Sequence, residues 1–304
     1  MIFNTQIKNL QTLNQRSLNE LSVSTDIFIY SNQLNLRATT IVDLMQSETS
    51  DQDTCSVQLF YDENITGIKK AILSQCETGQ CRVTIDISCI AGDTLAELFY
   101  NLSKFANQCE INVKILYTLA KYIEPKKENS FNKTVSPAHR AFSGWLANPQ
   151  FPILAIVGLG YESDKAVGAV EYLDASEEYI FVPNSSEIKY KDKVEEVNKN
   201  FIRRNSENKR FDYIVEDPVY TIHTLNSLLV AAKKEFKPVL LPFGPKIFFA
   251  CALVVALANP EASVWYVSGQ KNDTQHDEQE VASIIGFEFS LTTEMLISAN
   301  FDTC

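Results

Sequence analysis

Apolar runs of strand length alternate with segments of helical period along most of the chain. Such alternation is typical of a parallel sheet covered by helices, because parallel strands are joined by helix-sized crossovers. The run Val83-Thr84-Ile85-Asp86-Ile87 is apolar nearly throughout, as expected of a strand buried on both faces. In the first half, the pattern predicts strands at residues 26–31, 56–61, 82–88 and 112–118, and helices at 36–45, 64–75 and 92–107.

The same order of elements returns in the second half. There the pattern predicts strands at residues 153–158, 179–183, 212–215, 238–243 and 263–268, and helices at 164–173, 187–203, 219–234 and 245–258. We therefore predict an α/β fold of two Rossmann-like parallel-sheet units in tandem, related by an internal duplication in which the second copy has one extra strand-helix unit. The alternative is a single doubly wound sheet without repeats, and both readings place loops at the carboxyl ends of the strands.

The predicted organisation has four parts. Residues 1–118 form the first unit, 119–151 a charged, proline-broken linker or arm, 152–269 the second unit, and 270–304 a C-terminal tail. Within these parts, residues 7–21 read as a short polar helix, and residues 281–301 as a helix or hairpin.

Composition narrows the function classes. A chain of 304 residues with 45% hydrophobic residues can bury a sizeable core. Its net charge of −11 disfavours a broad surface for duplex nucleic acid, because such surfaces need clustered Lys and Arg. The longest apolar run, residues 247–258, is shorter than the roughly 20 residues of a membrane helix. Residues 1–21 lack the pattern of a secretory signal, so we expect a cytoplasmic location and no membrane contact.

Neither metal nor cofactor is indicated by the cysteines and histidines. The seven cysteines are odd in number and lack paired spacing, which favours reduced thiols over disulfides or a zinc site. None of the three histidines has a spaced partner for a metal or for a nucleophile-base pair. The positions are Cys55, Cys76, Cys81, Cys89, Cys109, Cys251 and Cys304, with His139, His223 and His276.

A glycine-containing turn follows the first strand of the second half, at residues 158–165. Glycine lets a backbone approach phosphate, and free N–H groups at a helix start attract anions. The turn resembles part of a dinucleotide fingerprint, but Ser163 replaces the third glycine and the next strand lacks a terminal acidic residue, so no nicotinamide cofactor is expected. The alternative is a tight turn capped by Ser163 or Asp164. The candidate ligand contacts of this turn are Gly160, Tyr161, Glu162 and Lys165. Asn184, after the next strand, is a further candidate; the alternative is that Asn184, Ser185 and Ser186 cap the helix that begins at Glu187.

A second candidate turn is Gly244-Pro245-Lys246, which follows the strand at residues 238–243. Pro245 is suited to the first helical position, and Lys246 puts a cation in the first turn of the helix. A positive charge at this end of a helix costs stability unless an anion or carboxylate compensates it. We therefore predict that Lys246 contacts a ligand; the alternative is a lysine that points into solvent.

Equivalent positions in the first half carry polar residues. Ser31 and Arg37 flank the junction of the first strand and helix, where an arginine could grip a phosphate with two donors. Asp86 and Ser88 end the central strand, and Asp86 interrupts an apolar run, so it either pairs internally or faces the site. For Arg37 the alternative is an exposed helix arginine.

The strand that leads into Gly244-Pro245-Lys246 is followed by a helix and then by the strand Val264-Trp265-Tyr266-Val267-Ser268-Gly269. This arrangement resembles the end of CRISPR-associated Rossmann-fold (CARF) sensor domains and of the related doubled SAVED domains. The resemblance covers the plan of residues 25–269. It implies binding of cyclic or linear oligonucleotide messengers across a pair of Rossmann-like units. Gly244 and Lys246 match the phosphate-facing turn of the family, and Pro245 stands where that turn usually has threonine.

The resemblance implies a nucleotide-type ligand sensor or regulator in antiviral defence. The nuclease or helix-turn-helix effector usual in the family has no counterpart here, which implies signalling to a separate effector protein. The partners expected are thus a small anionic nucleotide-type ligand, an effector and a second copy in a homo-oligomer. The alternative is a hydrolase or transferase acting on a nucleotide or sugar phosphate, with Asp86, Glu162 or Asp164 as acid or base. A third reading is a scaffold that binds proteins through an exposed apolar patch.

Overall fold

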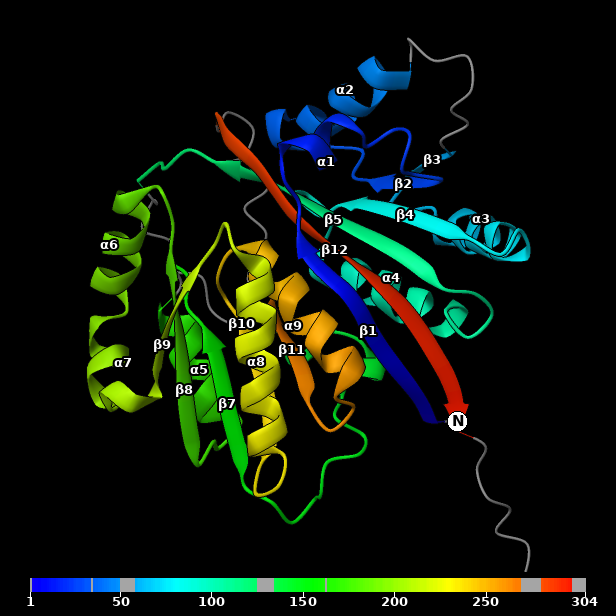
Figure 1. Ribbon diagram of the computed structural model, residues 1–304. Coiled ribbons are helices and arrows are strands. Elements are labelled where there is room, and N and C mark those ends of the chain that lie inside the picture. The colour runs from blue at the N-terminus through cyan, green and yellow to red at the C-terminus, as the bar shows by residue number, and fades with distance from the viewer. Residues whose placement is uncertain are drawn as a thin grey trace, which may run out of the picture.

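The computed structural model describes residues 2–33, 35–49, 58–124, 134–161, 163–268 and 280–296. Within these residues the chain forms two six-stranded, mostly parallel sheets with helices packed against them (Figure 1). Each strand predicted from the hydrophobic pattern is present, so the expected α/β fold of two Rossmann-like units is confirmed.

The first sheet has the order β1-β12-β5-β4-β2-β3. The four strands β2 to β5 run parallel, and β12 pairs antiparallel with both β5 and β1. The strands are β1 (Ile2–Thr12), β2 (Ile27–Tyr30), β3 (Gln58–Tyr61), β4 (Cys81–Asp86), β5 (Ile111–Ala120) and β12 (Val281–Leu296). The helices of this unit are α1 (Gln15–Asn19), α2 (Leu36–Thr49), α3 (Ile65–Glu77) and α4 (Gly92–Phe105).

The second sheet has the order β6-β11-β10-β7-β8-β9, in which β7 to β11 run parallel and β6 is antiparallel to β11. The strands are β6 (Thr134–Pro137), β7 (Ile153–Gly158), β8 (Glu177–Asn184), β9 (Arg210–Ile214), β10 (Lys237–Pro242) and β11 (Ser263–Ser268). The helices are η1 (Arg140–Phe142), α5 (Ser163–Tyr172), α6 (Ile188–Val197), α7 (Lys199–Arg204), η2 (Glu207–Lys209), α8 (Pro218–Ala232) and α9 (Lys246–Ala258).

The two sheets share one strand plan. The order β12-β5-β4-β2-β3 in the first sheet matches β6-β11-β10-β7-β8 in the second. Strand β9 and helix α8 are the extra strand-helix unit of the second sheet. This matching order is what an internal duplication predicts. It makes β4 and β10 equivalent, as well as the helices α4 and α9 that follow them.

A layer of helices lies between the two sheets, where α9 packs against both α4 and α8, and α8 and α9 contact strands of both sheets (Figure 1). Helix α9 is buried over nearly its whole length because sheets lie on both sides of this layer. That burial explains why its sequence is apolar all round rather than amphipathic. The outer face of the first sheet packs on α2 through Phe28, Ile41 and Leu116, and that of the second sheet packs on α5 to α7.

Three segments differ from the expectations. Residues 7–21 were expected to be one helix, but residues 7–12 belong to β1 and only residues 15–19 form the short helix α1. The segment read as a linker supplies β6, which pairs with β11, and buries Phe142. The segment read as a tail supplies β12, which lies between β1 and β5.

None of the helices in the described ranges combines the length and the apolar character that a membrane crossing requires.

Candidate functional site

The carboxyl ends of the two sheets meet through Lys246. This residue begins α9, directly after β10, and its Nζ donates hydrogen bonds to the backbone oxygens of Ser88 (3.0 Å) and Ile90 (2.8 Å) in the turn after β4. Because β4 and β10 are equivalent strands, equivalent turns of the two units touch. Strand β4 neighbours β2, and β10 neighbours β7, the first parallel strand of each unit. The strand order reverses between these neighbours. Ligands of open α/β sheets bind at such points.

Asp86 and Ser88 form a buried hydrogen-bonded group at the end of β4. The backbone N–H and the hydroxyl of Ser88 both donate to Asp86 Oδ1, at 2.9 and 2.5 Å, and the Thr118 N–H donates to Ser88 Oγ at 2.8 Å. Asp86 is 1% exposed. Burial raises its pKa to about 6, against the opposing effects of Ser88, Lys246 and Arg37. Asp86 therefore pairs internally and also lies close to both cations.

Arg37, in the first turn of α2, reaches over the end of β5. Its Nε donates to the Thr118 carbonyl at 3.3 Å, and its guanidinium carbon lies 5.3 Å from the centre of the Tyr117 ring. The ring face favours the cation electrostatically. The positive charges of Arg37 and Lys246 both act on Asp86 and on Cys89. Two of the three predicted cations, Arg37 and Lys246, thus gather at one rim, whereas Lys165 is not among the main charges that act on Asp86 or Cys89.

The environment of Lys246 explains why a lysine is tolerated at a helix start. Burial lowers its pKa to about 8, while Cys89, Asp86 and Asp62 favour the charged form. The two carbonyl oxygens from the other unit compensate the unfavourable helix dipole. Lys246 therefore contacts backbone carbonyls rather than pointing into solvent, and its ammonium has one further donor. The predicted ligand contact stays a prediction.

Buried oxygen atoms without a partner among the described residues lie at both carboxyl edges. Three of them are Asp62 Oδ1 and Thr118 Oγ1 on the first sheet and Tyr213 Oη on the second. A buried polar atom without a hydrogen bond is costly and calls for an explanation such as a ligand or an ordered water. Sequence reasoning missed these three residues. Asp62 had a signal, because it directly follows β3 as Ser31 follows β2; Ser31 itself is 6% exposed at this edge.

The glycines of the second unit are explained by contact between two turns. A Cβ at Gly244 would lie 2.9 Å from both the Leu159 carbonyl oxygen and Tyr213 Oη, and a Cβ at Gly160 would collide with the Phe243 carbonyl. Asn198 Nδ2 also donates to the Gly160 carbonyl at 2.8 Å. The close approach that requires glycine at these two positions is therefore between backbones at the switch point of the second sheet.

We expect Gly160→Ala to lower the free energy of unfolding by about 1–3 kcal/mol, because the added methyl group must displace the backbone at Phe243. Gly67→Ala is the matched control, because a Cβ there meets the side chain of Asn64, which can move. Urea unfolding of both variants measures the difference. Equal losses would show that the turn after β7 can relax and that its glycine is not required by packing.

The remaining predicted contacts are more dispersed. Lys165 is buried near the start of α5. Tyr161 packs edge-to-face on Tyr190, with ring centres 5.2 Å apart. Asn184 ends β8, where the following Ser185 and Ser186 donate to Glu216 Oε1.

Two further predictions concern Pro245 and Glu162. Pro245 is the N-cap of α9 rather than its first helical residue, so the proline lies one position before the expected place. Glu162 lies outside the described residues.

No protein-family model and no curated protein matches the chain. Two solved structures are similar at low identity. One is a candidate universal stress protein of Pseudomonas aeruginosa UCBPP-PA14, with 11% identity over 84% of this chain and 87% of that one, at a TM-score of 0.27. The other is a protein of unknown function from Pseudomonas aeruginosa PAO1, with 10% identity over 81% and 93% of the two chains, at a TM-score of 0.25. Neither likeness bears on function.

Proposed function

We propose that the protein binds a small anionic, nucleotide-type ligand where the carboxyl edges of its two sheets face each other. The observation that carries the proposal is the Lys246 contact, which joins equivalent turns of the two units and brings Arg37, Lys246, Asp86 and Ser88 to one rim. Facing strand ends of this kind supply backbone amides and side chains from both units to a single guest.

The helix starts at this rim support an anionic guest. The N-caps of α4 and α9, Ala91 and Pro245, make no side-chain capping hydrogen bond. The first N–H groups of a helix have no partner within the helix, and the helix dipole places positive charge there. Phosphate groups suit such sites, and Arg37 adds a planar donor that can bind a phosphate with two hydrogen bonds.

The unpartnered oxygens support a ligand with hydrogen-bond donors beside its phosphates. Asp62 Oδ1 and Thr118 Oγ1 on one edge and Tyr213 Oη on the other can pair with the ring nitrogens or hydroxyl groups of a nucleoside. Tyr117 and Tyr161 provide aromatic surfaces near the same junction, where each influences the pKa of Tyr190. A nucleotide combines all of these features.

A role as a sensor follows from the CARF and SAVED resemblance, which pairs two Rossmann-like units around an oligonucleotide messenger. In this proposal the ligand bridges the two carboxyl edges, and the signal passes to a separate effector protein in antiviral defence. The enzymatic alternative places acid-base chemistry on Asp86, whose pKa of about 6 lies near neutrality. Its carboxylate is buried and bonded to Ser88, which favours binding over proton transfer.

Calorimetric titration with cyclic dinucleotides, trinucleotides and tetranucleotides tests the proposal. We expect one of these probes to bind, and Arg37→Gln to weaken that binding at least about tenfold through loss of a charge-assisted hydrogen bond. Arg203→Gln, on an exposed position of α7, is the matched control and should bind like the unmodified protein. Absence of heat with every probe, or equal affinity for both variants, contradicts the proposal. Chromatography after titration reveals cleavage if the enzymatic alternative holds.

A further inference from the structure

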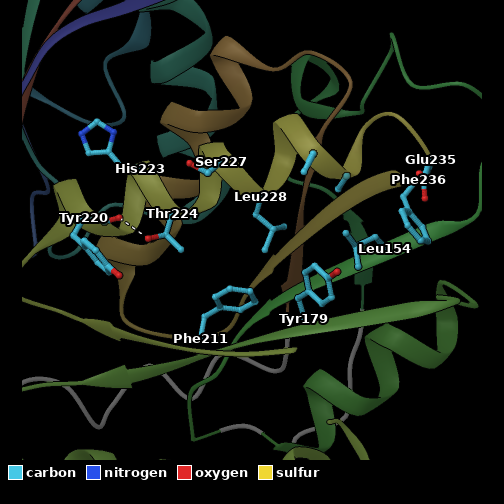
Figure 2. Close-up of a pocket in the computed structure, with 12 residues that line it drawn as sticks. Leu154, Tyr179, Phe211, Tyr220, His223, Thr224, Ser227, Leu228, Glu235 and Phe236 are labelled. Atoms are coloured by element: carbon cyan, nitrogen blue, oxygen red, sulfur yellow. Dashed lines mark hydrogen bonds between the residues drawn. The ribbon is translucent and has the colours of Figure 1, made fainter. Parts of the chain in front are cut away.

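A wide groove of about 680 Å³ lies away from the carboxyl edges, between α8 and the inner face of the second sheet (Figure 2). Leu154, Tyr179 and Phe211 form its floor, from β7, β8 and β9. Leu228 projects from α8 toward these side chains in Figure 2, and Phe236 closes the end beside Leu154. The groove is thus mostly apolar, with the half-buried aromatic rings of two strands in its floor.

Helix α8 is the wall of this groove and also a ridge on the surface. Its 15 residues include no Asp, Glu, Lys or Arg, although 21% of the chain is charged. Its outward stripe contains Tyr220, 57% exposed, and Val230, 45% exposed, with His223 and Ser227 between them. This stripe therefore lacks the charged residues that are usual on the solvent-facing side of a helix, and in the single chain it is uncovered.

We propose that this surface joins two copies of the chain about a two-fold axis, with the α8 ridge of each copy lying in the groove of the other. Ridge-into-groove packing of two helices is a common packing mode, and a two-fold interface requires a surface that complements itself. The α8 ridge and the groove lie side by side on one face, so each copy offers both. The inference does not depend on the proposed ligand.

Charge favours a second copy as the occupant. The chain carries a net charge of −11, so two copies repel each other wherever their acidic surfaces meet. The α8 surface avoids this cost, because Glu235 is the one Asp, Glu, Lys or Arg among the described residues that line the groove. The same lining carries no cation for a phosphate. An aromatic, uncharged centre is also typical of the energetically important part of an interface.

Sedimentation velocity over a series of protein concentrations tests this inference. We expect the unmodified protein to dimerise, and Tyr220→Asp to weaken the dimer at least tenfold, because its carboxylate would be buried against an identical apolar surface. Ser227→Lys places a charge on the same ridge without removing an apolar side chain, so it should weaken the dimer even if Tyr220 also supports the fold. Circular dichroism verifies that both variants are folded.

Tyr172→Asp is the matched control, because Tyr172 is a 67% exposed tyrosine on α5, outside the groove. We expect this variant to dimerise like the unmodified protein. An unmodified protein that is monomeric at every concentration overturns the inference. So does a dimer that Tyr220→Asp and Ser227→Lys leave intact, or one that Tyr172→Asp weakens equally.

Discussion

Replacing Lys246 by methionine is expected to lower the free energy of unfolding by about 2–4 kcal/mol. The Nζ of Lys246 donates to the carbonyls of Ser88 and Ile90, which belong to the other unit. Methionine keeps most of the side-chain length but leaves both oxygens without this donor, and hydrogen bonds to charged groups each contribute about 1.5–3 kcal/mol. Methionine also removes a buried ammonium whose charged form burial disfavours, so the net loss is smaller than the sum of the two hydrogen bonds. Chemical denaturation of the purified protein measures the loss.

Lys237→Met is the matched control for this prediction. Lys237 also donates to a backbone carbonyl, that of Pro149, but through a single exposed contact of 3.3 Å within its own unit. We expect a loss of less than about 0.5 kcal/mol there, as for most surface substitutions. If the Lys246 and Lys237 variants lost equal stability, the ammonium of Lys246 would not tie the two units together.

Replacing Asp86 by asparagine is expected to raise stability by about 2–3 kcal/mol at about pH 7.5. Burial raises the Asp86 pKa from its ordinary value of 3.8 to about 6. Between these values the folded chain binds more protons than the unfolded chain, so stability falls as pH rises through this window. Above about pH 6 the ionised carboxylate costs about 3 kcal/mol, which asparagine removes while retaining an acceptor for Ser88.

Denaturation at two pH values separates this effect from other causes. Near pH 4 Asp86 is protonated in the folded chain, so the Asn variant and the unmodified protein should differ little. Asp192→Asn, on an exposed position of α6, should change stability by less than about 0.5 kcal/mol at both pH values. A destabilised Asp86→Asn variant at neutral pH would show that the carboxylate stabilises the fold by pairing with Lys246 and Arg37.

A carboxylate that costs stability at neutral pH is typical of a functional site, where local rules of folding are broken. Asp86 fits this pattern, since it interrupts an otherwise apolar buried strand at the edge where two cations meet. A stability gain in Asp86→Asn together with lost ligand binding would show that the carboxylate serves ligand binding at the expense of stability.

The parallel strands were predictable because their signal is local. A run such as Cys81–Asp86 contains the β-branched residues Val83, Thr84 and Ile85 and is buried on both faces, and the segments between the runs have helical period. Strands β1 and β12 were not predictable in the same way. Residues 2–12 and 281–296 pair across nearly the whole chain, and a pairing so distant leaves little trace in a local window. Polar residues with fair helix propensity, such as Gln6 and Lys8, instead favoured a helix.

The site was partly predictable for a related reason. Lys246 was identified because a cation at a helix start is electrostatically costly, and that cost follows from sequence position alone. Its acceptors are backbone carbonyls of Ser88 and Ile90, which no side-chain pattern indicates. The contact of Gly160 with the Phe243 backbone could not be predicted, because a glycine turn looks the same whether a ligand or another backbone approaches it.

Hydrogen–deuterium exchange with and without a bound cyclic oligonucleotide tests the central claim most directly. If the guest lies between the two carboxyl edges, the amides after β4, around residues 88–93, and those after β10, around residues 244–248, should become protected together. Protection of one turn without the other, or protection confined to the α8 groove, would contradict a site shared by the two units.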